Sequence, residues 1–518
     1  MYCYKFNLLS SITLLLACTL AGCNVQEEKS SEFEAYYKNV PFETQPVERP
    51  LFNNYTVSVT DFGAVGDGVA DETQAINNAI TAVSEKGGGR VVIPAGIWYT
   101  GPIELKSGVD LHACRNALII FNDDPNVYPI IETSFEGLNT RRCTSPIWAR
   151  NAENIALTGE GVYDGAGDSW RFVRREKVTE SQWNELLSRP GCYVNGDLWY
   201  PSKESYQGHI ICDAFNNPQG LEDDDEWEAI RHWLRPVMFS FIECRNLLVE
   251  DVTLRNSPAW MLHPLMCENV IIKNVKIFNP WYSQNGDALD VESCRRVLIA
   301  DCLFDAGDDG ICIKSGKDAD GRMRAMPCSH VVVRNSQVLH GHGGFVVGSE
   351  MSGGVNHIYV ENCTFTGTDV GLRFKSARGR GGVVEDIYIE NINMCDIPTD
   401  ALTFNLYYNG KSVSEDDGSG LKSITAEPVT EETPEFRNIY IKNIKCRNAN
   451  RAMYFHGLPE MPLKNIVIED VDITANQSGQ FAYSDSITMR CVRINKAAST
   501  FAFNNCNMVD TTGIAYAQ

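Results

Sequence analysis

The chain has 518 residues, which is long enough for several domains or for one elongated repeat domain. Its 67 acidic residues outnumber its 45 basic residues and give a net charge of -22 at pH 7. This balance argues against a nucleic-acid partner, because basic patches supply most of the affinity for nucleic acids. An anionic ligand would need a local basic patch that outweighs the overall negative field.

The first residues predict an export signal that ends in a lipid anchor. Lys5 precedes a mostly apolar run from Phe6 to Leu20, which has the length of a signal peptide and is too short to span a bilayer comfortably. The run leads into Leu-Ala-Gly-Cys, which resembles a lipobox with Cys23 as the lipidated residue. We therefore predict a lipoprotein signal peptide over residues 1–23, with an ordinary signal peptide as the alternative.

The segment after Cys23 is expected to be a linker, over residues 24–50. Its acidic pair Glu27-Glu28 resembles the surface-export signal of some Gram-negative lipoproteins. We expect an exported protein on the outer membrane, facing either the periplasm or the cell surface. The lipid would be its only contact with the membrane.

Residues 61–80 predict a glycine-rich turn followed by a helix, with Asp71 as a suitable N-cap. The apolar face of this helix consists of Ala75, Ile76, Ala79 and Ile80. A phosphate-binding loop is the alternative, but the sequence lacks the Lys-Ser/Thr ending and the βαβ setting of such loops. We interpret the helix as a cap on the N-terminal end of a repeat domain that spans residues 51–518.

Between about residue 165 and residue 235 the apolar periodicity vanishes and five tryptophans occur. They are Trp170, Trp183, Trp199, Trp227 and Trp233. We interpret this segment as an insertion folded against the repeat domain. Its tryptophans either form ordinary core or wall a binding site, and the sequence favours neither.

A repeated pattern begins near residue 247, in which alternating apolar residues end in Asn or Asp. The eight markers are Asp251, Asn274, Asp301, Asn335, Asn362, Asn391, Asn443 and Asp470, with steps of 23, 27, 34, 27, 29, 52 and 27 residues. Alternation is typical of half-buried strands, and Asn and Asp tolerate the left-handed conformation of a sharp bend. Such coils bury their apolar faces only by stacking. The sequence therefore predicts an all-β, right-handed parallel β-helix, and the long step is either two coils or one coil with a long loop.

A second register in the same coils predicts one particular sheet. A small residue followed by alternating large apolar residues recurs from residue 288 to residue 455. The expected interior stack is Leu289, Ile311, Phe345, Leu372 and Leu402. The alternate side chains would then point outward, about 4.8 Å apart from rung to rung.

Fifteen cysteines follow Cys23, an odd number without a CxxC pair or the spacing of zinc ligands. We expect most of them to be small buried hydrophobic residues, with some disulfides possible. The sequence predicts no metal and no other cofactor.

Charged residues gather at one bend of the predicted sheet. Asp287 and Asp309 hold equivalent positions on neighbouring rungs, and Asp308 and His342 share the position just before. A solvated charged face explains one such residue, but three carboxylates and a histidine at one bend are harder to explain that way. Carboxylates this close cannot all stay ionised, so one pKa should rise. One protonated and one ionised carboxyl are what acid/base cleavage of a glycosidic bond requires.

Four motifs at these positions resemble the signatures of glycoside hydrolase family 28, the polygalacturonases, whose usual forms are NTD, GDD, GHG and RIK. The motifs here are Asn285-Gly286-Asp287, Gly307-Asp308-Asp309, Gly341-His342-Gly343 and Arg373-Phe374-Lys375. Each motif alone is weak, but four in order on a β-helix repeat are specific. The resemblance covers roughly residues 55 to 475. Gly286 departs from the usual Thr and removes a hydroxyl near a catalytic carboxylate.

The resemblance implies a role for each residue. Asp308 would be the general acid, with His342 beside it to maintain its protonation, and Asp287 and Asp309 would position and activate water. The family inverts the sugar configuration, which would place the carboxyls about 6.5–9.5 Å apart. Substrate binding is implied for Arg373 and Lys375, with Lys314, Asp290 and Tyr408 as further candidates. Tyr407 is the alternative to Tyr408, and a packing role for Tyr408 is equally plausible.

The implied substrate is a pectic polysaccharide or oligogalacturonide with α-1,4-linked galacturonic acid. Basic residues near the motifs predict the local patch that an anionic sugar needs, and they are Lys314, Lys317, Arg322, Arg324, Arg373, Lys375, Arg378 and Arg380. The runs 341–354 and 371–382 resemble those of bacterial exo-acting members, so exo action is preferred over endo action. His342 favours galacturonan over rhamnogalacturonan, whose hydrolases generally lack it. An insertion at 165–235 that blocks one end of the groove would produce exo action.

Two alternatives use the same scaffold. A calcium-dependent pectate lyase would need acidic ligands, but the acidic run at 222–226 lies in the insertion and has the composition of a solvated loop. A non-catalytic pectin-binding surface protein would leave the pair Asp308-Asp309 unexplained. Hydrolysis is the preferred function.

Overall fold

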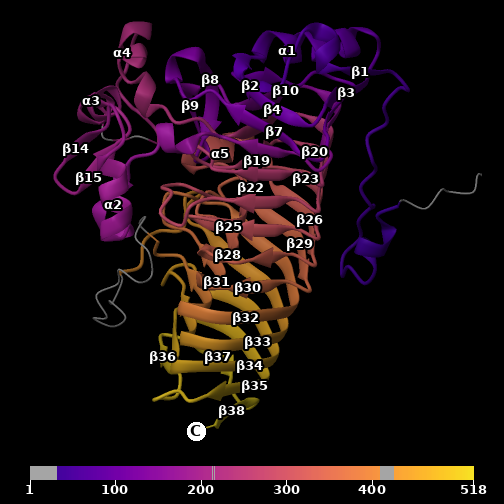
Figure 1. Cartoon of the computed structure of the whole chain (residues 1–518). Helices are drawn as coiled ribbons and strands as arrows, with labels where there is room; N and C mark the ends of the chain where they lie inside the picture. The colour runs from indigo at the N-terminus through magenta and orange to yellow at the C-terminus, as the bar shows by residue number, and fades with distance from the viewer. Residues whose placement is uncertain (1–31, 213, 215, 409–424, 518) are drawn as a thin grey trace, which may run out of the picture.

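Parallel strands wind into one long solenoid, whose coils stack along the chain (Figure 1). The computed structural model describes residues 32–212, 214, 216–408 and 425–517. The predicted right-handed parallel β-helix is confirmed. The predicted signal peptide and Cys23 lie outside the described residues.

Each central coil contributes one strand to each of three parallel sheets. The front sheet contains β10 (Ile147–Arg150), β16 (Phe239–Ile242), β19 (Leu262–Leu265), β22 (Leu289–Glu292), β25 (Asp309–Lys314), β28 (Gly341–Val347) and β31 (Thr368–Lys375). The side sheet contains β11 (Glu153–Thr158), β17 (Arg245–Glu250), β20 (Glu268–Lys273), β23 (Arg295–Ala300), β26 (Cys328–Arg334) and β29 (Val355–Glu361). The rear sheet contains β12 (Val162–Asp164), β18 (Thr253–Arg255), β21 (Lys276–Phe278), β24 (Leu303–Asp305), β27 (Gln337–Val338) and β30 (Thr364–Thr366).

Both ends of the solenoid continue this arrangement. The N-terminal elements are β1 (Thr56–Ser58), β2 (Asp67–Asp71), α1 (Thr73–Glu85), β3 (Gly89–Ile93), β4 (Gly96–Thr100), β5 (Ile103–Glu104), β6 (Val109–Ala113) and β7 (Ala117–Phe121). The C-terminal coils are β32 (Val383–Asn405), β33 (Glu435–His456), β34 (Leu463–Ala482), β35 (Ser484–Asn495), β36 (Ala502–Asn504), β37 (Asn507–Asp510) and β38 (Ile514–Ala517). Helix α1 covers the N-terminal end, as predicted (Figure 1), with Ile76, Ala79 and Ile80 fully buried. The N-cap position is Glu72 rather than the predicted Asp71, but Asp71 Oδ1 still accepts a hydrogen bond from the Thr73 backbone N–H at 2.9 Å.

The predicted interior stack of the front sheet is confirmed. The paired residues in adjacent strands are Leu289, Ile311, Phe345, Leu372 and Leu402, and all are fully buried. The outward column therefore runs from Asp290 through Cys312 and Val346 to Arg373, as alternation requires.

The Asn and Asp markers turn one strand into the next. All eight adopt positive φ angles, from 50° at Asn443 to 67° at Asp251. Several also bond to the marker of the next coil, as in Asn274 Nδ2 to Asp251 Oδ1 at 2.7 Å. Because Ile389 pairs with Ile441, the 52-residue step is one coil with a long loop.

The described part of the expected linker packs against the side sheet instead of hanging free. It contains the short 3-10 helix η1 (Glu34–Tyr37). Phe33 and Val47 are buried in a cluster with outward-facing apolar residues such as Leu248 and Ile271. Glu48 is held by Asn269, whose side chain bonds both its N–H and its carbonyl. The middle residue of each repeat triplet is apolar although it faces outward, so the sequence did indicate that another segment covers this sheet.

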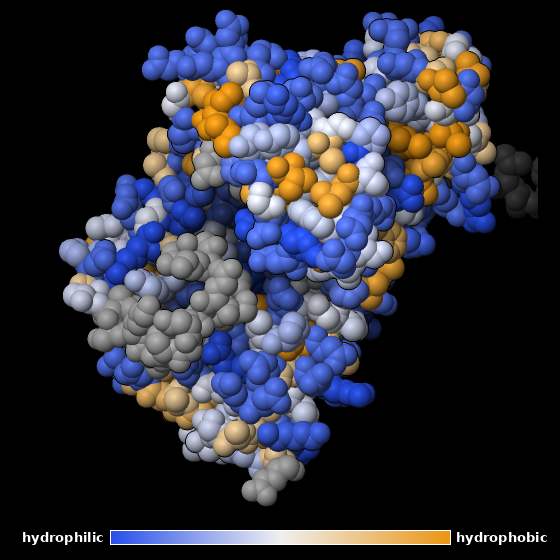
Figure 2. Space-filling model, turned by 60° about the vertical axis from the view of Figure 1, so that its left-hand side comes forward, coloured by the Kyte–Doolittle hydropathy of each residue, from blue (hydrophilic) through white to orange (hydrophobic). Residues whose placement is uncertain are grey.

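The segment 165–235 forms a separate lobe beside the front sheet (Figure 1). Its elements are β13 (Val173–Arg174), α2 (Glu180–Leu187), β14 (Tyr193–Asn195), β15 (Leu198–Tyr200), α3 (Lys203–Ile211) and α4 (Asp224–Ala229). Its five tryptophans are at most 9% exposed and lie in two packed clusters. They are therefore mainly core, although Trp227 also lines a surface cleft. The surface on this side of the molecule is mostly hydrophilic (Figure 2).

The fifteen cysteines in the described residues are all unpaired, and ten of them are buried. This agrees with their predicted role as small hydrophobic residues. Among the described helices, none has the length and apolar character to cross a membrane.

Candidate active site

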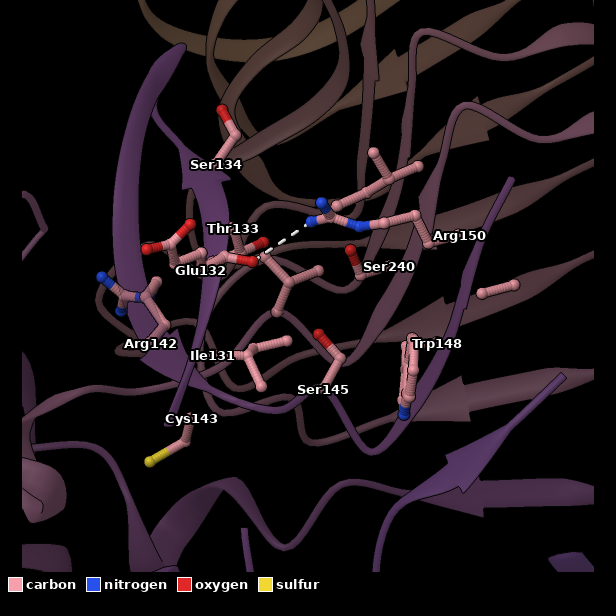
Figure 3. A pocket seen from close by; sticks show the side chains of 13 residues that line it. Ile131, Glu132, Thr133, Ser134, Arg142, Cys143, Ser145, Trp148, Arg150 and Ser240 are labelled. Carbon is pink, nitrogen blue, oxygen red and sulfur yellow. Dashed lines mark hydrogen bonds between the residues drawn. The ribbon is translucent and has the colours of Figure 1, made fainter. Parts of the chain in front are cut away.

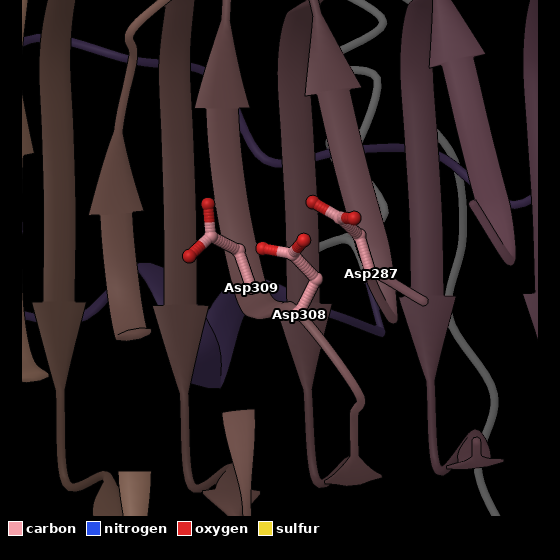
Figure 4. A group of neighbouring side chains, drawn as sticks. All are labelled: Asp287, Asp308 and Asp309. Atoms are coloured by element: carbon pink, nitrogen blue, oxygen red, sulfur yellow. The ribbon is translucent and has the colours of Figure 1, made fainter. Parts of the chain in front are cut away.

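Asp287, Asp308 and Asp309 meet where two neighbouring coils enter the front sheet. Asp309 begins β25, and Asp287 lies two residues before β22, its neighbour. One oxygen from each carboxylate lies within 4.8 Å of the others, and the three side chains point to the same side (Figure 4). The expected gap of about 6.5–9.5 Å is not found between these oxygens. The spacing of adjacent rungs, about 4.8 Å, brings them closer.

The proton predicted for one carboxyl of this cluster belongs to Asp287. Burial raises the pKa of Asp287 well above its usual range, and the carboxylates of Asp290 and Asp308 raise it further. The Oδ1 atom of Asp287 is buried without a hydrogen-bond partner among the described residues. Burial also raises the pKa of Asp290 well above its usual range, so Asp287 and Asp290 both hold protons more tightly than Asp308.

Asp308 forms an ion pair with His342, whose Nδ1 lies 3.0 Å from Oδ1. Burial raises the pKa of Asp308, but His342 and then Lys375 outweigh burial and hold it below its usual range. Asp308 in turn raises the pKa of His342. The pair therefore holds one proton, which resides on the imidazole ring. Its side chains are 18% and 37% exposed, which marks the open side of the site.

Asp309 pairs with the two cations of the fourth motif. Lys375 Nζ lies 2.8 Å from Asp309 Oδ2, and an Arg373 guanidinium N–H donates to Asp309 Oδ1 at 3.3 Å. Burial raises the pKa of Asp309, but these two cations outweigh burial and lower it. The Tyr408 ring lies 5.6 Å from the Arg373 guanidinium carbon and 5.5 Å from Lys375 Nζ. Tyr407 is instead near His456. The structure thus brings Tyr408 to the predicted carboxylate-binding pair.

Lys314 and Asp290 lie beneath the aspartate cluster and are almost completely buried. Lys314 Nζ lies 2.8 Å from Glu350 Oε2 and 3.6 Å from Asp290 Oδ1. Glu350 was missed in the sequence because it lies three residues after the end of β28, outside the repeat pattern. Lys314 and Asp290 are therefore buried neighbours of the aspartate cluster in this structure, and Lys314 is already paired with protein carboxylates.

The predicted basic patch is largely neutralised. Every one of its described cations lies within ion-pair distance of a carboxylate, which the sequence pattern does not show. Besides the pairs above, these contacts are Lys317 with Glu136 (4.0 Å), Arg322 with Glu432 (3.4 Å), Arg324 with Glu292 (2.8 Å), Arg378 with Glu460 (2.7 Å) and Arg380 with Asp318. An anionic ligand must therefore compete with protein carboxylates for these cations.

The three aspartate oxygens are close enough to share a cation. However, His342 already balances Asp308, and Lys375 and Arg373 balance Asp309. A hard cation such as Ca²⁺ takes six to eight oxygen ligands without competing positive charges. The donor set therefore favours proton chemistry over a metal centre.

A family model described as "Glycosyl hydrolases family 28" matches residues 230–500, just over half of the chain. The chain belongs to glycosyl hydrolase family 28. A second model, "Rhamnogalacturonase A/epimerase, pectate lyase-like", matches residues 56–114. Both matches fall on the solenoid, and the first includes the whole aspartate cluster.

Known proteins of family 28 resemble the chain over most of its length. A probable polygalacturonase of Vitis vinifera is 27% identical over 81% of this chain and 74% of its own. An exo-poly-alpha-D-galacturonosidase of Dickeya chrysanthemi is 29% identical over 68% of this chain and 57% of its own. The crystal structure of a hyperthermoactive exopolygalacturonase from Thermotoga maritima is 32% identical, with a TM-score of 0.70 over 87% of this chain and 94% of that one. The family 28 exopolygalacturonase of Yersinia enterocolitica, 21% identical with a TM-score of 0.72 over 89% and 79%, supports the fold.

Gly286, where family 28 usually has Thr, faces the side chain of Ser283. A β-carbon on Gly286 would lie 1.9 Å from Ser283 Oγ, and one on Gly307 would lie 2.1 Å from the same atom. The Ser283 hydroxyl thus fills the space of the missing Thr and lies between the first two motifs. Arg235, the last residue of the insertion, donates to Asn285 Oδ1 at 2.9 Å. Neither side chain was predicted, since neither belongs to a motif.

Gly286→Thr is expected to lower kcat/KM by about 10- to 100-fold, because overpacking costs about 1–3 kcal/mol and would displace the loop that carries Asp287. Ser283→Gly/Gly286→Thr should recover most of this loss, since it removes the clashing Oγ and Cβ. Kinetics of hydrolysis and thermal unfolding of both variants check the prediction. Equal activity of the single and double variants would show that the two side chains do not compete for this space.

The hairpin of β8 (Ile130–Phe135) and β9 (Leu138–Cys143) closes the front sheet on the N-terminal side of the cluster. Phe135 is buried against Trp260, with ring centroids 4.4 Å apart. Arg324 bridges Ser134 Oγ at 2.9 Å and Glu292 Oε1 at 2.8 Å. The outward residues beneath, His263, Asp290 and Glu292, are therefore at most 1% exposed. This hairpin therefore covers the outward face of the front sheet on the N-terminal side of the cluster.

Proposed function

We propose that this family 28 protein hydrolyses the α-1,4 bonds of polygalacturonate and removes galacturonate from one chain end. Glycoside hydrolase activity follows from the family, and two of the proteins that it resembles are named for exo-acting galacturonan hydrolysis. The observation that carries the proposal is the cluster of Asp287, Asp308 and Asp309 beside Arg373 and Lys375.

Substrate binding would activate the base. A galacturonate carboxylate that binds Arg373 and Lys375 competes with Asp309 for both cations. Asp309 then loses the charges that lower its pKa and becomes a stronger base towards water. Protonated Asp287 would hold the same water through a hydrogen bond. Substrate binding therefore makes Asp309 basic enough to activate the water that attacks the glycosidic bond.

Asp308 would deliver the proton to the leaving oxygen. The ion pair with His342 holds this proton close at hand, and Asp308 is the more exposed carboxyl of the cluster. As negative charge develops on the leaving oxygen, the proton passes from the ring through the carboxyl to that oxygen. His342 thus acts as the proton reserve of Asp308.

His342→Gln is expected to move the alkaline limb of the pH profile of kcat/KM towards lower pH. The raised pKa of His342 keeps a proton on the pair until pH rises through that pKa, where the ion pair and the acid are lost together. Without the ring, only Asp308 itself holds the proton, and a carboxyl loses it at lower pH. Initial rates from pH 4 to pH 9 measure the limb, and an unchanged limb would remove His342 from this role.

The distance between the carboxylates bears on whether hydrolysis inverts or retains the configuration at the anomeric carbon. The oxygens within 4.8 Å are closer than the spacing usual for inverting enzymes, whereas the family implies inversion. We expect inversion, so the first product from the α-linked substrate should be the β anomer. Proton NMR during the first minutes of hydrolysis identifies the anomer, and initial release of the α anomer would establish retention instead.

Sizing of the products from polygalacturonate tests the whole proposal. Monomer from the earliest time points indicates exo action, and a ladder of oligomers indicates endo action. A product that absorbs in the ultraviolet would indicate the eliminative reaction of a lyase. Binding without release of reducing sugar would indicate a non-catalytic surface protein. Only the first result supports the full proposal.

We also propose export and outer-membrane anchoring through the lipid on Cys23. The support is the apolar run and the lipobox-like sequence. Cys23→Ser should abolish incorporation of labelled fatty acid and move the protein from the membrane fraction to the soluble fraction. Unchanged membrane association of the variant would rule out this anchor.

A further inference from the structure

A cavity of about 190 Å³ lies between the β8–β9 hairpin and the outward faces of β10 and β16 (Figure 3). Cavities of about 150 Å³ bind a bare six-membered ring such as benzene, so this space has the size of one substituted ring. Its apolar walls include Ile131, Val237 and Ile242, with Trp148 at one side. It joins a wider cleft that shares part of the hairpin.

This cavity is separate from the aspartate cluster. Trp148 pairs in register with Ser240, which precedes His263 in the same outward column. The column continues towards β22, so Ser240 and Asp290 are two rungs, or roughly 10 Å, apart. Over the intervening rung, Trp260 packs edge-on against His263, with ring centroids 5.1 Å apart, and Phe135 packs against Trp260. A ligand in the cavity therefore does not reach the catalytic carboxylates.

Two largely buried serines present their hydroxyls to the cavity without a partner among the described residues. Ser145 and Ser240 are 7% and 6% exposed. Neither hydroxyl hydrogen-bonds to any of the residues that the structure describes, and Figure 3 shows both directed at the enclosed space. Both hydroxyls are therefore free to bond to a polar ligand or to water that enters the cavity.

Arg150 supplies a cation at the mouth of the cavity. One of its guanidinium N–H groups donates to the Glu132 backbone oxygen at 3.1 Å, but no described carboxylate lies within ion-pair distance of it. The other arginines of the adjoining cleft, Arg141 and Arg324, are paired with Asp224 and Glu292. Arg142 turns its guanidinium away from the cavity (Figure 3). Arg150 is therefore the cation free to bind an anion.

We propose that this cavity is a second, non-catalytic binding site for a single uronic acid residue. The carboxylate binds Arg150, the apolar ring face lies against Trp148, and ring hydroxyls bond to Ser145 and Ser240. A neutral hexose lacks the charge for Arg150, and an apolar ligand leaves both serines unpartnered. The proposal rests on the proposed function only in naming galacturonate as the uronate at hand.

Calorimetric titration of the full chain with galacturonate tests the site. Asp308→Asn keeps the catalytic site inactive, and we expect two bound galacturonates per chain in this background. Adding Arg150→Met should weaken one of the two sites by at least about tenfold, as expected for a lost charge-assisted pair. Adding Arg115→Met, a distant surface arginine paired with Glu160, should change neither site. Galactose should bind the cavity at least about tenfold more weakly than galacturonate.

Identical isotherms with and without Arg150→Met would overturn the proposal, as would equal binding of galactose. If Arg150→Met lowers the melting temperature, Ser145→Ala/Ser240→Ala provides the same comparison with a smaller change. Hydrolysis of polygalacturonate by the Arg150→Met single variant should stay within about twofold of the parent. If the parent does not hydrolyse polygalacturonate, the proposed function is refuted. The binding of galacturonate to the cavity is still tested, because the titration does not depend on hydrolysis.

Discussion

Asp308→Asn is expected to lower kcat on polygalacturonate by about 10²- to 10⁴-fold, the contribution of a general acid. Asp308 is the partly exposed carboxyl of the cluster and is paired with the proton on His342 at 3.0 Å. An amide has nearly the same shape but does not relay that proton to the leaving oxygen. Arg373 and Lys375 are unchanged, so the affinity for oligogalacturonate should fall little. Reducing-sugar release and calorimetric binding measure the two effects separately.

Asp305→Asn is the matched control for this variant. Asp305 forms its own pair with His340, at 2.9 Å, but it lies in the rear sheet outside the cluster. The control should keep the activity of the parent, because the exposed pair contributes little to stability and nothing to the site. Activity of Asp308→Asn near the parent level would overturn the acid assignment.

The solenoid was predictable because its determinants are local. A residue at the corner between two strands needs a left-handed conformation, which Asn and Asp tolerate, so these residues mark the corners in the sequence. Alternation then decides which side chains face inward. The stack from Leu289 to Leu402 could therefore be predicted from the local pattern of each coil alone. Since register fixes position on the front sheet, the meeting of Asp287 with Asp309 on adjacent coils was predictable too.

What the sequence did not predict depends on side chains that meet across irregular segments. The hairpin around Phe135 is antiparallel and has no repeat, so its contact with Trp260 has no periodic signal. The protonation pattern also depends on distances. The pKa of Asp287 is raised because it is buried without a cation partner, whereas that of Asp308 is lowered because His342 lies against it. Motifs identify the carboxylates but do not assign the proton among them.

Shortening the β8–β9 hairpin is expected to convert exo action into endo action. Thr133 and Thr140 face each other across the hairpin, so an Asn-Gly turn can replace residues 134–139 between them. This removes Phe135 from Trp260 and removes Ser134 from Arg324. The outward face at His263 then becomes open to further sugar units, so the polymer can lie across the cluster instead of ending there. The products should change from monomer to a ladder of oligomers.

The fall in viscosity of polygalacturonate per bond broken measures this change, because internal cleavage shortens chains far more than removal of end units does. Glu132→Gln is the control, since its side chain lies on the same hairpin but is 85% exposed and pairs with Arg141 of that hairpin. The deletion leaves the strands of the coils intact but removes buried Phe135, which packs against Trp260, so we expect a lower melting temperature. The products are therefore compared at a temperature at which both proteins are folded. Continued release of monomer alone would mean that another segment ends the groove, and the burial of His263, Asp290 and Glu292 would then have no bearing on where the chain is cut.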